Sequence, residues 1–456
     1  MGASRFAARR MPAASYRPRS SRRPRWRRRL RTALPRRAAR GVAWVGGNCV
    51  ELLPLGEALF PALLRAWAAA RSEIWLETYI FHDDPIARAL AQALVDAARR
   101  GVRVRVLVDG LGSHRALPTL RATFDEAGVE FMAYRPWRHW FNLVQRGHWR
   151  RLHRKLCVVD GREAFIGGIN LIDDRLDLHH GWSAQPRLDY AVAVRGPAVA
   201  QVRASMRRLW LRTAATGSVR RQLAHAPGPD LLRSAPLRRR YLAELFDAAA
   251  GRAPALPQPG CADAAPTMRA ALVVRDNLLH RRAIEHAYVR AIDRARRSVL
   301  LVTPYFYPGQ TFREALKRAA ARGVEVTLLL QGRADYRAAA WAAQALYGEM
   351  VHAGVRIFEY HRAFLHGKVA VIDELWATVG SSNIDPLSLL VNREANLLVR
   401  DAAFAATLAR HVREQLADAV PIDGQRLRRR VAWWVPPFVA VVARLFIALA
   451  GGTRRY

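Results

Sequence analysis

The sequence predicts an α/β protein composed of two repeated α/β domains. The first reason is a pattern, His-x-Lys-x-x-x-x-Asp, that occurs at 153–160 and again at 366–373. The second reason is that apolar, strand-like runs alternate with helix-like stretches in the same order around each copy. Repeats of this kind indicate a duplicated unit, and strands that alternate with helices indicate βαβ units with largely parallel sheets.

The early part of each repeat supplies two strands and a helix. Apolar and aromatic residues fill 74–82 in the first half and 299–307 in the second, and a helix-like stretch ending in Arg-Gly-Val follows each run. A further apolar run comes next, at 102–109 and at 324–331. Short apolar runs with such boundaries are typical of buried strands, so we expect the same order of elements in both halves.

The late part of each repeat carries the motif. Another strand starts at an Ala-Gly-Val sequence, and the motif strand follows, with apolar residues at 156–159 and 369–372. On a strand, residues i and i+2 point to the same face, so His153 and Lys155 project together, and the second copy repeats this. After six more residues a glycine-rich turn ends in asparagine, and later an acidic residue precedes a further strand.

The composition divides the chain into five parts. We expect the two α/β domains to pack face to face, and the segment between them is rich in Pro, Ala and Arg, as exposed linkers are. One short helix around 241–250 is expected within that segment. The predicted parts are a basic arm (1–40), the first domain (41–212), the linker (213–266), the second domain (267–420) and a basic and apolar C-terminal segment (421–456).

Lysine is rare in this chain, which makes its positions informative. Lys and Arg together number 74, yet only Lys155, Lys317 and Lys368 are lysines, and two of these three lie in the repeated motif. Arg and Lys are not interchangeable where geometry matters, so the two motif lysines are expected to take part in chemistry. Cysteines and the remaining histidines are not at recurring metal-ligand spacings, so we expect no metal and no cofactor.

The formal net charge of +37 favours anionic partners, either nucleic acid or an anionic lipid surface. The first forty residues contain many arginines and no acidic residue, which predicts a disordered basic arm. A membrane-surface anchor, or a true start at Met11, are the alternatives. Near the C-terminus, 431–450 is apolar but contains Pro436-Pro437 and Arg444. A central arginine opposes insertion by about 2.5–3.5 kcal/mol, so an interfacial anchor is favoured over a spanning or buried core helix.

The paired motifs with their trailing asparagines resemble the phospholipase D superfamily over about residues 45–420. Within it, the chain is most similar to bacterial cardiolipin synthases that lack an N-terminal membrane-spanning pair. This resemblance implies a fold of two phospholipase D-like α/β domains that form a pseudo-dimer with one shared active site. One departure is Gly168, where many relatives have serine. The stretches that carry the resemblance are 151–156, 165–170, 275–277, 304–306 and 379–386.

The resemblance implies phosphodiester exchange through a phosphohistidine, with His153 as nucleophile and His366 as general acid and base. Residue chemistry suits this independently, since a neutral imidazole can attack phosphorus and a protonated one can supply a proton to the leaving oxygen. Cations and donors must stabilise the charge on the phosphate. The expected ones are the ammonium groups of Lys155 and Lys368, the amides of Asn170 and Asn383, and the hydroxyl of Ser381. Because Gly168 has no hydroxyl, the first half should offer one hydroxyl fewer to the substrate phosphate.

Four carboxylates complete the predicted site. Asp189 and Glu394 match positions where relatives hold a carboxylate against the catalytic histidine, which fixes the tautomer and raises basicity. The alternative for both is a salt bridge at the edge of a strand. Asp160 and Asp373 complete the two motifs, but we expect them to anchor the turn after the strand rather than to touch substrate.

These expectations favour a phosphatidyl transferase that makes cardiolipin from two phosphatidylglycerol molecules and releases glycerol. Its partners would be anionic phospholipid and a membrane surface, with no nucleic acid, at the cytoplasmic face of the inner membrane of a bacterium as a peripheral protein. The alternative is a phosphodiesterase or nuclease of the same fold, which the charge favours. A non-catalytic binding protein is the third reading, and intact motifs in both halves oppose it.

Overall fold

A computed structural model describes residues 42–136, 150–178, 181–224, 267–276, 280–333, 337–385, 388 and 391–423. The predicted basic arm, the short helix expected around 241–250 and the apolar stretch 431–450 lie outside these residues. None of the helices within the described part of the chain is both long and apolar enough to cross a membrane.

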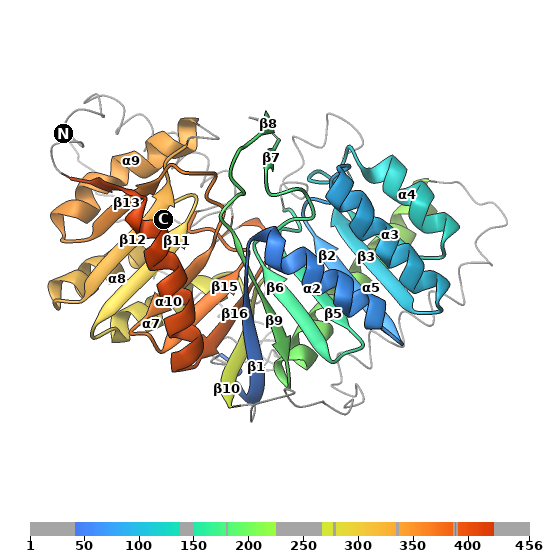
Figure 1. Ribbon diagram of the computed structural model, residues 1–456, viewed down its shortest axis with the longest axis horizontal. Helices are drawn as coiled ribbons and strands as arrows, with labels where there is room; N and C mark the ends of the chain where they lie inside the picture. The colour runs from blue at the N-terminus through green and yellow to red at the C-terminus, as the bar shows by residue number, and fades with distance from the viewer. Residues whose placement is uncertain are drawn as a thin grey trace, which may run out of the picture. The chain divides into compact units, whose positions relative to one another are not determined.

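The two halves repeat one order of elements (Figure 1). The first half contains β1 (Val45–Pro54), α2 (Leu55–Ala69), β2 (Glu73–Thr78), α3 (Pro85–Arg99), β3 (Arg103–Asp109), α4 (Leu117–Glu126), β4 (Glu130–Tyr134), β5 (Lys155–Val159), β6 (Glu163–Gly167), β7 (Leu176–Asp177), β8 (Gly181–Trp182), β9 (Tyr190–Arg195) and α5 (Ala198–Ala224). The second half contains β10 (Met268–Arg275), α7 (Ala283–Arg294), β11 (Ser298–Thr303), α8 (Gln310–Ala321), β12 (Glu325–Gln331), α9 (Arg337–His352), β13 (Arg356–Tyr360), β14 (Val369–Ile372), β15 (Trp376–Gly380), β16 (Glu394–Arg400), α10 (Ala402–Ala417) and β17 (Val420–Ile422).

Fifteen of these strands form one continuous sheet. The order in the first half is β1-β9-β6-β5-β2-β3-β4, and the second half follows the matching order β10-β16-β15-β14-β11-β12-β13, with β17 added at the edge. Antiparallel pairing of β1 with β10 joins the two halves. The duplicated α/β architecture predicted from the motif repeat is therefore confirmed.

The expectation of largely parallel sheets is wrong. Only β2-β3-β4 and β11-β12-β13 pair in parallel, whereas the motif strands β5 and β14 pair with both neighbours in antiparallel fashion. The cause is the tight turn after each motif strand, where φ is +52° at Asp160 and +64° at Gly161, and +53° at Asp373 and +52° at Glu374. Two successive residues with positive φ form the turn that reverses a hairpin, and Asp-Gly is a strong signal for it.

The halves share one hydrophobic core, as expected for domains that pack face to face. Strands β6 and β9 contact β15, and β6 also contacts β16. Side chains such as Val192 and Val194 from one half lie in the same buried cluster as Val379 and Leu397 from the other. The long helix of each half also reaches the first strand of the other half, since α5 contacts β10 and α10 contacts β1. Each large apolar side chain buried here contributes about 1.5–3 kcal/mol to holding the halves together.

Two further cores lie between the sheet and the outer helices. Trp67, Leu94 and Phe124 are among the buried residues of the first half, and Tyr288 and Phe312 are among those of the second. In these cores, helices α2, α3 and α4 pack against the sheet of the first half, and α7, α8 and α9 pack against that of the second. This packing holds the motif strands in position.

The structure differs from the expected domain boundary at 212. Helix α5 continues to Ala224, into the segment expected as linker. The reason is visible in the sequence, since no proline interrupts 198–224 and the next one is Pro227. A helix of this kind ends where proline and glycine become frequent.

Candidate active site

Both motif strands begin at the place where the two halves meet. Strand β5 starts at Lys155, and β14 starts immediately after Lys368, with the motif histidine two residues before each lysine. Each strand lies between two neighbours, β2 and β6 for β5, and β11 and β15 for β14. The strand position is therefore fully determined by its pairing, which holds the histidine and lysine at one edge of the sheet.

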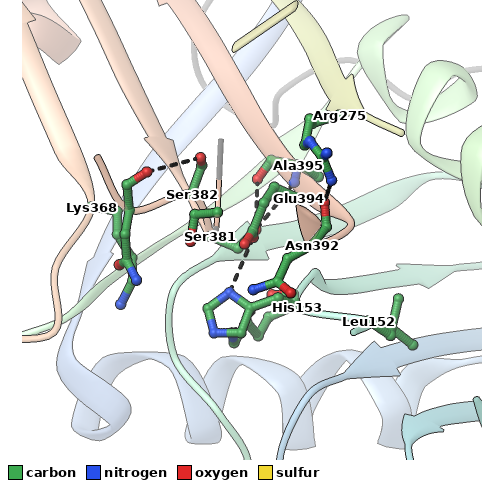
Figure 2. A network of polar contacts seen from close by, with 12 residues as sticks. Leu152, His153, Arg275, Lys368, Ser381, Ser382, Asn392, Glu394 and Ala395 are labelled. Atoms are coloured by element: carbon green, nitrogen blue, oxygen red, sulfur yellow. Dashed lines mark hydrogen bonds and ion pairs between the residues drawn. The ribbon is translucent and has the colours of Figure 1, made fainter. Parts of the chain in front are cut away.

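Each histidine binds a carboxylate of the other half. The Nδ1 atom of His153 lies 3.1 Å from Oε2 of Glu394, a contact seen in Figure 2. The Nδ1 atom of His366 lies 2.5 Å from Oδ2 of Asp189. Both carboxylates are buried, whereas the imidazole side chains keep 12% and 23% of their surface exposed. The crossed pairs make one composite site, in which neither half supplies a complete histidine–carboxylate pair of its own.

The backbone produces this crossing through short parallel bridges between the halves. The amide of His153 donates to the carbonyl of Arg393 at 3.0 Å, and the amide of Arg393 donates to the carbonyl of Arg151 at 2.8 Å. On the other side, the amide of His366 donates to the carbonyl of Leu188 at 2.8 Å. Since Arg393 and Leu188 directly precede Glu394 and Asp189, these bonds fix the register that places each carboxylate beside its histidine.

The two motif lysines are buried beside the histidines. The Nζ atom of Lys155 donates to the carbonyl of His153 at 2.8 Å, and Nζ of Lys368 donates to the carbonyl of His366. Burial lowers the pKa of Lys155 to about 8 and that of Lys368 to about 7, although the carboxylates Asp189 and Glu394 oppose this shift. A buried ammonium is ready to accept an anion, because the anion replaces lost solvation.

The surroundings of the site favour anionic carboxylates at Asp189 and Glu394 and a neutral imidazole at His366. Burial alone would raise the pKa of Asp189, but the charges of Lys368 and His366 outweigh it and hold that pKa below its usual value. The pKa of Glu394 is likewise lowered, by His153 and Lys155 against the effect of burial. Burial, aided by the charge of Lys368, lowers the pKa of His366 well below its ordinary range.

Asp160 and Asp373 lie in the turns at the other end of the motif strands. The Asp160 carboxylate accepts backbone hydrogen bonds from Arg71, Ser72 and Glu73, at 2.7–2.9 Å. Asp373 accepts the matching set from 296–298. Asp160 and Asp373 complete the two motifs, and these contacts agree with the turn-anchoring role that we expected for both.

The predicted phosphate-binding residues fall into two groups. The side-chain oxygen of Asn170 accepts a hydrogen bond from the backbone amide of Ile80 at 3.2 Å. The side-chain nitrogen of Asn170 is therefore the donor that can face a ligand. Asn383 is buried and its Oδ1 atom has no hydrogen-bond partner within the described residues. The atom that Asn383 leaves unpaired is thus an acceptor, and its side chain also hydrogen-bonds Asp385, so in this arrangement Asn170 keeps the donor that a phosphate needs. The role of both asparagines toward phosphate stays a prediction.

Ser381 is engaged differently from what we expected. It is fully buried, and its hydroxyl donates to Oε2 of Glu394 at 2.6 Å, the same oxygen that meets His153 (Figure 2). A hydroxyl has one proton, so Ser381 positions the carboxylate rather than offering that proton to phosphate. In the first half, a Cβ added to Gly168 would lie 2.3 Å from Oδ1 of Asp189. The departure at Gly168 thus removes a hydroxyl from the carboxylate, not from the phosphate.

Arg275 is a site residue that sequence reasoning did not assign. It lies directly opposite Glu394 in the pairing of β10 with β16, is buried, and donates through Nη1 to the carbonyl of Asn392 (Figure 2). Its Nε and Nη2 atoms have no hydrogen-bond partner among the described residues. The register places Leu55 at the matching position of the first half, beside Asp189. The stretch 275–277 is among those that carry the family resemblance, but nothing in the sequence assigned Arg275 a role, and the comparison between the halves shows its place beside Glu394.

Tyr79 is a second residue that sequence reasoning missed. Its ring lies 4.9 Å from the imidazole of His153, centroid to centroid, and Nζ of Lys155 lies 5.5 Å from the ring centre. The ring therefore covers one side of the first motif. The aromatic run at 74–82 predicted a strand, but not which of its side chains would face the site. Within the described part of the chain, no group of three or more His, Cys, Asp or Glu could hold a metal ion.

Comparisons with known proteins agree with this geometry. A family model described as cardiolipin synthase, PLD-like domain, matches residues 63–210 and 288–416. Cardiolipin synthase B of Escherichia coli (strain K12) is 37% identical over 393 residues, which covers 86% of each chain. Cardiolipin synthase A of Pseudomonas putida (strain GB-1) is 32% identical and covers 87% of this chain and 76% of its own.

A solved structure supports the fold alone. The phosphatidylserine synthase of Haemophilus influenzae Rd KW20 aligns with a TM-score of 0.55 at 12% identity, over 88% of this chain and 94% of its own. The two matched regions of the family model coincide with the two halves that meet at the crossed histidine–carboxylate pairs. The chain therefore belongs to the cardiolipin synthase family of proteins with phospholipase D-like domains.

Proposed function

We propose that the protein is a phosphatidyl transferase that makes cardiolipin from two molecules of phosphatidylglycerol and releases glycerol. The observation that carries this proposal is the crossed arrangement of His153 with Glu394 and His366 with Asp189. In each pair the carboxylate takes the Nδ1–H group, which leaves the Nε2 lone pair for chemistry. Two such imidazoles are what a two-step exchange at phosphorus requires.

In the first step, Nε2 of His153 attacks the phosphorus of the donor lipid. The bond from phosphorus to the glycerol oxygen breaks, and His366 gives its proton to that oxygen, so glycerol leaves and a phosphatidyl-histidine remains. In the second step, His366 takes the proton from a headgroup hydroxyl of the second phosphatidylglycerol. That oxygen attacks the phosphatidyl-histidine, which yields cardiolipin and restores His153.

The surroundings of the two carboxylates differ between the two histidine pairs. Glu394 accepts a hydrogen bond from the Ser381 hydroxyl at the same oxygen that meets His153, and the strand register places Arg275 opposite Glu394. Asp189 has no serine behind it, since Gly168 occupies that place, and its Oδ2 contact with His366 is the shorter of the two.

His366 acquires its proton together with the substrate in this scheme. In the empty site, burial and the Lys368 charge favour the neutral imidazole. A phosphodiester anion bound between Lys155 and Lys368 cancels much of that positive charge and thereby raises the pKa of His366. The general acid is then loaded only when a donor lipid is present.

The membrane is the source of both substrates in this proposal. The curated relatives are named cardiolipin synthases, and the net charge of +37 suits an anionic bilayer surface. We place the protein peripherally at the cytoplasmic face of a bacterial inner membrane. The segment predicted to anchor it, 421–456, lies almost wholly outside the described residues.

Purified protein incubated with phosphatidylglycerol vesicles tests the function directly. Lipid mass spectrometry should detect cardiolipin and an equal amount of glycerol, and His153→Ala should produce neither. Phosphatidic acid as the main product would indicate a phospholipase. Cleavage of DNA without any lipid product would support the nuclease alternative, which the positive charge favours.

A further inference from the structure

The link between the site asparagine and the site carboxylate differs between the halves. It spans 18 residues (171–188) from Asn170 to Asp189, but only 10 residues (384–393) from Asn383 to Glu394. In the first half the extra length contains strands β7 and β8, which pair with each other and not with the large sheet. The β7–β8 hairpin is therefore an addition to one copy of the repeat, and both of its stems lead into the active site.

The hairpin leaves the protein at the edge where the active site lies. Strand β6 ends at Gly167, which pairs with Lys155 at the start of the first motif strand. The returning chain is tied to the other half, because Leu188 donates its amide to the carbonyl of Phe364 at 2.8 Å. In Figure 1, β7 and β8 project at the top of the view, beyond the ends of the large sheet.

Hydrogen bonds hold the base of the hairpin in a defined position. The amide of Ser183 donates to the carbonyl of Arg175 at 2.7 Å, and the amide of Arg187 donates to the carbonyl of Asp174 at 2.8 Å. Nη2 of Arg187 also donates to the carbonyl of Leu176 at 2.7 Å. These hydrogen bonds hold the two strands of the hairpin together at their base, where Arg175 and Arg187 lie.

Two of the projecting side chains are large and apolar. Three large hydrophobic side chains are exposed in the described part of the chain, namely Leu178 at 44%, Trp182 at 66% and Leu375 at 56%. Single exposed apolar residues need no explanation. Here, however, two of the three lie on one short hairpin, and tryptophan with nearby arginine is the combination that favours the headgroup region of a bilayer.

A hollow beside the hairpin also suits a lipid. It has a volume of about 510 Å³ and lies between helices α2 and α3 and the base of the hairpin. Phe60, Leu64 and Ile86 line its helical side, and Arg175 and Pro186 line the side of the hairpin. Glu57, Asp173 and Asp174 also line the hollow, so its apolar side suits an acyl chain, whereas its rim does not favour an anionic headgroup.

We propose that the β7–β8 hairpin docks the protein on an anionic lipid bilayer, with Leu178 and Trp182 in the headgroup region. Arg175 and Arg187 at its base are paired with Glu57 and Asp177, so the attraction to an anionic surface comes from the net charge of +37 on the chain as a whole. Docking at this point brings the edge that carries His153 and His366 against the membrane, so a lipid need not leave the bilayer entirely. The inference rests on the proposed function for its substrate, but not for its binding surface.

The test compares Leu178→Ser/Trp182→Ser with Leu375→Ser in the full-length chain. Leu375 is a matched control, because it is equally exposed but lies in the turn at the far end of β14 from Lys368. Binding is measured by co-sedimentation with vesicles of equal parts phosphatidylglycerol and phosphatidylcholine. Turnover is measured on these vesicles and on dihexanoyl phosphatidylglycerol below its micelle concentration.

The double variant should bind vesicles about tenfold more weakly, since two large apolar side chains lose their burial. Its turnover on dilute vesicles should fall by a similar factor, whereas turnover on the monomeric lipid should stay unchanged. Leu375→Ser should behave as wild type in every assay. Unaltered vesicle binding by the double variant would overturn the proposal, and so would an equal loss on monomeric lipid, which would mean that the hairpin shapes the site instead.

Binding measured in a His153→Ala background separates this inference from the proposed function. No turnover occurs there, so vesicle affinity reports docking alone. If wild type made no cardiolipin but the hairpin variants still bound vesicles weakly, the proposed function would fail and the docking surface would stand. A change of oligomeric mass in the double variant, with unchanged vesicle binding, would assign the hairpin to a second copy of the chain and reject the proposal.

Discussion

Ser381 and Gly168 occupy matching places in the two halves, yet they leave the two histidine partners in different surroundings. Ser381 donates to Glu394, whereas Gly168 leaves room for Asp189 and could not carry a side chain without displacing it. From the sequence we expected instead that the Ser381 hydroxyl would bind the substrate phosphate. Only the position of the hydroxyl relative to the carboxylate decides between these roles, and residue spacing does not contain that information.

Ser381→Ala distinguishes the two roles kinetically. A residue that positions Glu394 should affect kcat, by roughly tenfold to a hundredfold, and leave KM for phosphatidylglycerol nearly unchanged. The pH profile of kcat should shift as well, because Glu394 loses a donor that stabilises its charge. A rise in KM with unchanged kcat would restore the phosphate-binding role. Gly168→Ser should also lower kcat, since its side chain would meet Asp189.

The buried lysines predict how activity depends on pH. Because their pKa values are lowered to about 8 for Lys155 and about 7 for Lys368, the positive charges are present below these values and are lost as pH rises. Therefore kcat/KM for an anionic donor should fall between about pH 7 and 9, far below the ordinary lysine pKa of about 10.4. At saturating lipid the bound phosphate favours the ammonium, so kcat should persist to higher pH.

Lys317 offers the control for this profile. It is the third lysine of the chain and pairs with Glu314 and Glu349 at the surface, away from the motifs. Lys317→Met should leave the pH dependence as it is. A kcat/KM that stays constant up to pH 9.5 in the wild type would contradict the assignment of Lys155 and Lys368 as phosphate-binding cations.

At the scale of elements, the motif strands and their histidine–lysine pairs could be predicted because they depend on local pattern. Apolar runs at 156–159 and 369–372 became β5 and β14, and the alternation of side chains placed the functional pairs correctly. Strand direction was missed, although the Asp160-Gly161 dipeptide is a hairpin signal. The pairing of His153 with Glu394 could not be predicted, because these residues are 241 positions apart in the sequence. It depends on a long-range backbone bridge between Leu152 and Arg393, which local sequence patterns do not reveal.

The turn that follows each motif strand gives a prediction about stability. Asp160 accepts three backbone hydrogen bonds and one from the Ser72 hydroxyl, and these donors hold its pKa below the usual value against the effect of burial. Asp160→Asn should therefore lower the free energy of unfolding by about 1–3 kcal/mol, measured by urea denaturation at pH 7. Activity of the folded protein at low temperature should remain close to that of wild type.

The sign of the pH effect at this turn follows from the lowered pKa. The contribution of Asp160 is present above the unfolded-state pKa of about 3.9, and it is lost as pH falls through the lower folded-state value. The stability difference between wild type and Asp160→Asn should thus shrink under acid conditions. If the variant unfolded like wild type but lost all turnover at pH 7, Asp160 would belong to the chemistry after all.

At the scale of the whole molecule, the duplication creates one site from two incomplete halves. The sheet is continuous through β1 and β10, the core is shared, and each histidine depends on a carboxylate of the other half. Separation of the halves would leave Glu394 and Asp189 without their partners, and a buried carboxylate without a partner is strongly unfavourable. Catalysis and the joining of the halves are therefore coupled through the same residues.

The number of covalent adducts per chain tests this shared site most directly. Wild-type protein mixed briefly with dihexanoyl phosphatidylglycerol and quenched at alkaline pH, where phosphohistidine survives, is analysed by intact and peptide mass spectrometry. The account predicts at most one phosphatidyl group per chain, located on His153, and none in His153→Ala. Two groups on one chain, or adducts on both His153 and His366, would show that each half acts as a separate site and would contradict the account.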